Sequence, residues 1–327
     1  MSLTITEVPR RRAPWIGIGV SGEWQDYREA LHAAELDFDV RSLPAQVEIP
    51  DPILSETMGV ALTRYEEVPG VKVNVRKTDD QILGCVSSQY GVIQNDDAFR
   101  LLQPLCHAGA VITHAGMTEQ GLVFMVAEWH NFYVGGEEYD LNIMCTNSFN
   151  GNFPCGLILT PTRIICQNMY RKVVKDQLIS VRHMSLAPRR IEEAIAQQEM
   201  LLSFEEKFKG VMESSLSIQL AQSDVDKLVA MIFPYPKDKE SMRYETSVQQ
   251  INMLREEFLD TYYCASDVKK FGACAMRFLH AYYDYLSHGN LVRRETLGNV
   301  DSKRLSRLVS GESVNGNIVN MLVQKKF

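Results

Sequence analysis

The side chains of this sequence best placed for chemistry are the cations between Thr160 and Arg190. Seven cations stand in this stretch against one acid, Asp176, which leaves a local charge of +6: Arg163, Arg171, Lys172, Lys175, Arg182, Arg189 and Arg190. The whole chain has a formal net charge of −7. Cations concentrated in one stretch of an acidic chain are typical of a site for a polyanion, most often nucleic acid.

Aromatic residues stand close to these cations. Tyr170 directly precedes Arg171-Lys172, and Phe149 precedes the Asn-Gly-Asn turn at 150–152. Aromatic faces beside cations suit the unstacked bases of a single strand, which a duplex does not offer. The predicted DNA-binding residues are Arg163, Arg171, Lys172, Lys175, Arg182, Arg76, Lys77, Tyr170 and Phe149. The alternative is a solvated helix face whose neighbouring aromatic residues belong to the core.

Catalytic motifs are not evident in the chain. Gly17-Ile18-Gly19 lacks the G-x-G-x-x-G spacing of dinucleotide sites, and neither H-E-x-x-H nor G-x-S-x-G occurs. His107, His114 and His130 fit no common metal-site spacing, and Cys166 has no identifiable base as a nucleophile's partner. We therefore expect no metal and no cofactor, and a non-enzymatic role is favoured while enzymatic activity stays open.

Composition bounds the class of protein and its compartment. The chain has 327 residues, of which 45% are apolar and 23% charged, as in ordinary globular proteins. Its seven cysteines are an odd number without a CxxC pair, which disfavours a structural zinc site and indicates a reducing cytoplasm. No apolar run is long enough for a transmembrane helix, and the first residues do not resemble a signal peptide.

The elements that would position these side chains are mainly strands, followed by helices. Val71, Val73 and Val75 alternate with polar residues, and a turn then leads into ILGCVSS, which predicts a hairpin. A further strand over 156–165 is expected to run into a helix through 166–175 that carries the cations. Strands and helices in separate blocks predict an α+β fold, with an antiparallel sheet and packed helices before a helical C-terminal part.

Four segments are expected along the chain. They are a flexible basic arm at 1–14, a strand-rich α+β core at 15–188, a helical region at 189–309 and a flexible tail at 310–327. Residues 42–58 contain three prolines and are predicted to form a loop.

Several motifs together resemble a known family. They are W-x-x-x-G at 15–19, A-x-L-D-F-D-V at 34–40, LGCVSSQYGVIQNDDAF at 83–99, HAGMTEQG at 114–121, TNSFNGNFP at 146–154, PTRIICQNM at 161–169 and FGACAMRFLHAYYDYLSH at 271–288. In these motifs the chain resembles the phage- and plasmid-borne family known as domain of unknown function nine-three-two. The resemblance implies no activity, but it implies a mobile genetic element and hence the cytoplasm of a bacterial host.

The order of strands and helices also resembles the single-strand annealing recombinases of phages, the RecT, Redβ and Rad-fifty-two-type group. This fold-level resemblance implies rings or filaments that hold single-stranded DNA in a basic groove without nucleotide hydrolysis.

Two functions follow from the sequence. The first is single-stranded DNA binding and annealing by a homo-oligomer in phage or plasmid recombination. The alternative is a phage-encoded interaction protein, for example a counter-defence factor, with no nucleic-acid role. The sequence pI of about 5.6 is compatible with DNA binding only if the cations form a local groove.

Overall fold

The computed structural model describes residues 13–60, 62–163, 170, 178–181, 183–184, 203–288, 297–310 and 316–324. Its strands form two antiparallel sheets. The six-stranded sheet has the order β1 (Val20–Trp24), β5 (Val111–Met117), β6 (Leu122–Val134), β7 (Glu137–Ser148), β8 (Cys155–Arg163) and β9 (Leu178–Val181). The three-stranded sheet has the order β2 (Val40–Pro50), β3 (Thr63–Arg76) and β4 (Ile82–Ser87).

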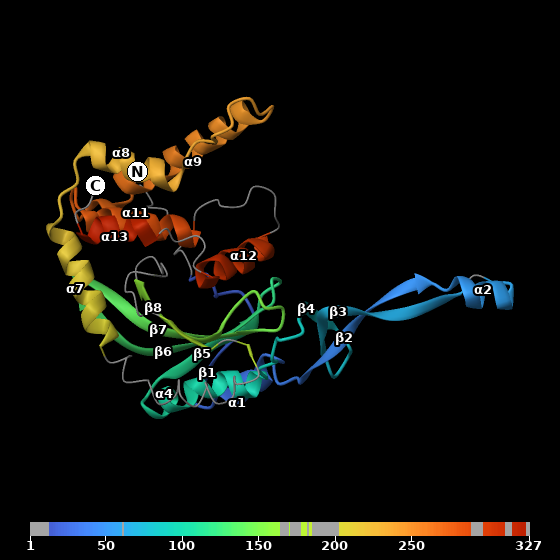
Figure 1. Cartoon of the computed structure of the whole chain (residues 1–327). Helices are drawn as coiled ribbons and strands as arrows, with labels where there is room; N and C mark the ends of the chain where they lie inside the picture. The colour runs from blue at the N-terminus through green and yellow to red at the C-terminus, as the bar shows by residue number, and fades with distance from the viewer. Residues whose placement is uncertain are drawn as a thin grey trace, which may run out of the picture.

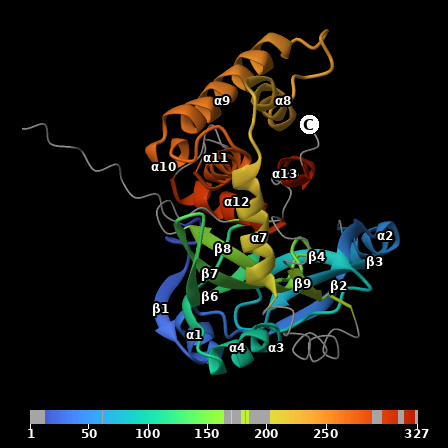
Figure 2. The same ribbon diagram turned by 90° about the vertical axis from the view of Figure 1, so that its left-hand side faces the viewer.

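Helices cover both faces of the six-stranded sheet (Figures 1 and 2). One face carries α1 (Tyr27–Ala33), α3 (Asn95–Phe99), the short 3₁₀ turn Arg100–Leu102 and α4 (Gln103–His107). The other carries α7 (Phe204–Ser217), α11 (Ala275–His288), α12 (Leu297–Ser310) and α13 (Gly316–Gln324). Beyond these lie α8 (Gln222–Ile232), α9 (Tyr244–Cys264) and α10 (Ser266–Lys269). The α+β class predicted from the sequence is confirmed.

The central strands are buried on both faces. Residues 122–127 of β6 have no exposed surface, and every residue of β8 is buried. A strand covered on both sides needs apolar residues at consecutive positions instead of alternation, and LVFMVA in β6 has them. The helices on both faces thus bury the central strands, and these strands position the turns at their ends.

The strands β2 and β3 form a long hairpin, the β2–β3 arm (residues 40–76). They pair from Val40–Arg76 at its base to Pro50–Thr63 at its far end, whereas β4 pairs only with 71–75 of β3. The far half is therefore a two-stranded ribbon, closed by α2 (Pro52–Met58), and it extends away from the rest of the molecule (Figure 1).

The prediction of a loop at 42–58 is wrong, because residues 42–50 belong to β2 and residues 52–58 form α2. β2 is an edge strand, where Pro44 and Pro50 cost no ladder hydrogen bond inside the sheet. Pro52 stands at the first position of α2, where its missing N–H would have no helical partner.

The prediction of a flexible tail from residue 310 is also wrong, because 316–324 form α13. Ile318, Val319 and Leu322 are buried, and α13 packs against α7, α8 and α11. The glycine- and asparagine-rich composition concealed a helical spacing of apolar residues. Residues 1–12 of the predicted basic arm and the predicted helix at 166–175 lie outside the described residues, except Tyr170, while Ala13 and Pro14 are buried.

Candidate anion-binding site

The structure places Arg163 in the interior, not on a DNA-facing surface. Its side chain has no exposed surface and pairs with Glu137 of β7 at 2.7 Å and with Asp267 of α10 at 3.0 Å. A further N–H donates to the backbone carbonyl of Asp267 at 2.8 Å. The prediction that Arg163 contacts phosphate is therefore wrong. Its ion pairs instead join the sheet to the helical layer.

The two predicted base-stacking residues are also buried. Tyr170 is fully buried, and its hydroxyl shares a hydrogen bond with Nδ1 of His280. Phe149 is buried against Phe38, with ring centroids 5.9 Å apart. Neither ring face is open to a base, so these two predictions are corrected as well, and the core alternative holds for both.

Two other predicted residues lie at the base of the β2–β3 arm. Arg76 lies over the ring of Phe38 at 4.4 Å and within 3.5 Å of Asp79. Lys77 pairs with Asp39 at 3.0 Å. Arg76 is largely covered, whereas Lys77 is half exposed. The remaining predicted residues, Arg171, Lys172, Lys175 and Arg182, lie outside the described residues.

A different set of cations borders a cavity on α12. Lys303 and Arg307 are one helical turn apart, and Ser302, Ser306 and Ser310 repeat at the same spacing beside them. The serines anchor the helix to the β5–β6 turn: Ser302 Oγ donates to Gln120 Oε1 at 2.9 Å and Ser306 Oγ at 3.2 Å. In the same contact, the backbone N–H of Glu119 donates to Ser302 Oγ at 2.9 Å.

The β7–β8 loop forms the facing wall, and Asn150 fixes its position. Asn150 Nδ2 donates to the carbonyl of Gln120 at 2.7 Å, and its Oδ1 accepts from the N–H of Asn152 at 3.0 Å. Gly121 allows this approach, because a Cβ there would lie 2.5 Å from Asn150 Nδ2. The motifs HAGMTEQG and TNSFNGNFP thus meet at one place.

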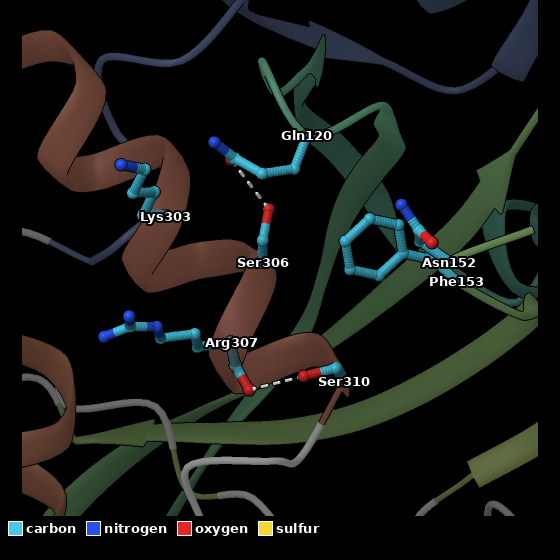
Figure 3. Close-up of a pocket in the computed structure, with 7 residues that line it drawn as sticks. All are labelled: Gln120, Asn152, Phe153, Lys303, Ser306, Arg307 and Ser310. Atoms are coloured by element: carbon cyan, nitrogen blue, oxygen red, sulfur yellow. Dashed lines mark hydrogen bonds between the residues drawn. The ribbon is translucent and has the colours of Figure 1, made fainter. Parts of the chain in front are cut away.

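The cavity has a volume of about 360 Å³. It is lined by Gln120, Asn152, Phe153, Lys303, Ser306, Arg307 and Ser310 (Figure 3). Ser306 points toward Gln120, while the side chains of Lys303 and Arg307 extend from the same flank of α12 (Figure 3). Two cations, two hydroxyls, two amides and one aromatic ring therefore line the cavity.

None of the described residues that line the cavity is a carboxylate, which favours an anion as the ligand. Gln120 accepts through Oε1 from two serines, which orients its amide, and Nε2 has no hydrogen-bond partner among the described residues. Among the described residues no group of three or more His, Cys, Asp or Glu side chains is placed to hold a metal ion. These cationic, hydroxyl and amide groups are of the types that can bind and orient an anionic ligand.

Sequence inspection missed this site because Lys303 and Arg307 do not form a dense run of cations. The available signal was periodic: serines at 302, 306 and 310 beside cations at 303 and 307. One face of a single helix then carries hydroxyls and guanidinium or ammonium groups together.

Fold and cavity define an α+β protein with a candidate anion-binding site. Residues 82–309 match the family described as Domain of unknown function (DUF932). The match covers more than half of the chain, and the chain belongs to this family. It includes every residue that lines the cavity except Ser310, and it excludes the β2–β3 arm. No curated protein and no solved structure matches the chain.

None of the helices in the described parts of the chain combines the length and apolar character that crossing a membrane requires.

Proposed function

We propose that the protein binds single-stranded DNA and anneals complementary strands without nucleotide hydrolysis, as part of phage or plasmid recombination in the bacterial cytoplasm. The observation that carries the proposal is the lining of the cavity, whose described residues combine two cations of α12 with amides from two motif turns and include no acid. Phosphates would lie along Lys303 and Arg307, and one nucleotide would enter between α12 and the β7–β8 loop.

The size of the cavity supports a single nucleotide, not a duplex. Pockets for small ligands have volumes of about 300–1,000 Å³, and this one lies near the lower limit at about 360 Å³. A duplex keeps its bases stacked and presents only its backbone, whereas a single strand can turn one base into a pocket. Gln120 and Asn152 offer amides to the edge of such a base.

Fluorescence anisotropy with labelled oligonucleotides tests the proposal. The parent protein should bind single-stranded DNA more tightly than a duplex of the same length, with little dependence on sequence and with affinity falling as salt rises. It should also accelerate pairing of complementary strands in the absence of ATP. Absence of binding at about 50 mM salt, where electrostatic binding is strong, would contradict the proposal.

The second candidate is an interaction protein with no nucleic-acid role. The β2–β3 arm favours it, because an exposed apolar projection is a usual feature of protein-binding surfaces. The oligonucleotide measurement separates the two functions, since an interaction protein would show no salt-dependent binding to either form of DNA.

A further inference from the structure

The β2–β3 arm exposes an unusual share of apolar surface. Fourteen large apolar side chains are exposed among the described residues, and six of them lie on the arm: Leu43, Val47, Ile53, Met58, Val60 and Tyr65. Ile53 is 77% exposed and Tyr65 67%. A two-stranded ribbon is marginally stable on its own in water, and an exposed apolar patch marks an interaction site. The apolar side chains at the far end of the arm are therefore not buried by other described parts of the chain.

A second projection carries the complementary chemistry. The α8–α9 corner (residues 231–243) joins α8 to α9, and it exposes Met231, Tyr235 and Met242. Tyr235 is held in place: its hydroxyl donates to Asn252 Oδ1 at 2.6 Å, and the Arg255 guanidinium lies 4.1 Å from its ring centroid. A fixed aromatic ring beside flexible methionines is a surface to which apolar side chains adapt readily.

The charges of the two projections are opposite. The far end of the arm, residues 46–67, contains five acids against one base and has a net charge of −4: Glu48, Asp51, Glu56, Glu66 and Glu67 against Arg64. The α8–α9 corner contains three bases against two acids and has a net charge of +1: Lys237, Lys239 and Arg243 against Asp238 and Glu240. The three bases of the corner are exposed. Opposite charge steers association and disfavours pairing of two arms with each other.

We propose that the far end of the arm docks on the α8–α9 corner of a second copy of this chain. Because the two surfaces differ, the contact is head-to-tail, and each copy donates one arm and receives another. Such a contact extends into a closed ring or an open filament, not into a symmetric dimer. The proposal is independent of DNA binding.

Two variants, each defective at one surface, test the contact. The arm variant is Ile53→Ser/Met58→Ser/Tyr65→Ser, and the corner variant is Lys237→Glu/Lys239→Glu/Met242→Ser. All six side chains are exposed, so both variants should unfold at the parent's temperature. The matched control is Tyr133→Ser, which removes an exposed ring from the β6–β7 hairpin, away from both surfaces.

Sedimentation velocity without DNA then gives the outcome. The parent and Tyr133→Ser should assemble beyond the dimer at micromolar concentration. Each defective variant alone should stay monomeric, with the concentration needed for assembly raised by about tenfold or more, as expected from loss of central contact residues. An equimolar mixture of the two variants should form a dimer and stop there, because it retains one intact arm and one intact corner.

Several results would overturn the proposal. They are a monomeric parent, defective variants that assemble like the parent, or a mixture that stays monomeric. With a monomeric parent, the arm would be assigned to a different protein partner. With a monomeric mixture, the arm and the corner would not be partners of each other.

Discussion

Arg163 joins the sheet to the helical layer through a side chain that has no exposed surface. Glu137 on β7 also pairs with Lys270, so two cations share this buried carboxylate while Asp267 holds the far side of Arg163. Buried charges are tolerated only when they are paired and hydrogen-bonded.

Replacing Arg163 by Met should lower the free energy of unfolding by about 3–5 kcal/mol, because the buried Glu137 loses its principal partner. Chemical denaturation measures the loss. Arg64→Met is the control, since its exposed pair with Glu66 contributes only about 0–1 kcal/mol. Equal stability of Arg163→Met and the parent would show that the pairs are dispensable.

His280 should make stability depend on pH. Burial, followed by the nearby charges of Arg163 and Lys270, holds its pKa well below the ordinary value. Below a pH of about 6.5 the unfolded chain binds a proton at this histidine that the folded protein does not bind, so the free energy of unfolding falls as pH falls.

Replacing His280 by Asn keeps a polar atom near Tyr170 and removes the titration. Denaturation at several pH values between 7.5 and 5 should show a shallower loss of stability for His280→Asn than for the parent. Burial also lowers the pKa of His183, to about 4, so some dependence on pH remains in the variant. Identical slopes for the two proteins would contradict the assignment.

The sequence could not separate buried from exposed cations. Arg163 belongs to the dense stretch of cations, but charge density does not report that acids on β7 and α10 converge on this residue. Tyr170 and Phe149 show the same limit, because aromatic residues beside cations serve the core as readily as a stacking site.

At the scale of elements, α13 closes the helical layer. Its apolar residues at 318, 319 and 322 lie on one face, which packs against α7, α8 and α11. The spacing of apolar residues within this short segment indicates a helix, whereas the glycine- and asparagine-rich sequence around it indicates a flexible tail.

Ile318→Ala should reduce the free energy of unfolding by about 2–5 kcal/mol, as for other large-to-small changes in a core. Asn320→Ala, on the exposed face of the same helix, should change it by less than about 0.5 kcal/mol. Thermal unfolding compares the two variants. Equal and small effects would show that α13 does not pack against the protein in solution.

The hairpins of the sheet could be predicted because their patterns are local. The pairs β3–β4, β5–β6 and β6–β7 each join strands adjacent in the chain, and their turns contain recognisable residues. The cavity could not be predicted, because it depends on α12 reaching a turn about 180 residues earlier in the chain: Ser306 lies 186 residues from Gln120. No short-range pattern encodes that contact.

At the scale of the whole molecule, an acidic chain places two cations together at the cavity. The formal net charge is −7, yet the described residues that line the cavity include two cations and no acid. Local potential, not net charge, governs where a polyanion binds. The acidic far end of the β2–β3 arm would repel DNA and leave the cavity as the preferred place for a phosphate.

The dependence of single-stranded DNA affinity on salt tests the proposed site most directly. The Lys303→Ala/Arg307→Ala variant should bind more weakly than the parent, and its plot of log K against log salt should be shallower by about 1.4, because each lost phosphate contact removes about 0.7. The control variant Arg41→Ala/Lys227→Ala loses two exposed cations elsewhere and should keep the parent's slope. If the folded Lys303→Ala/Arg307→Ala variant binds with the parent's affinity and slope, DNA does not bind at this cavity.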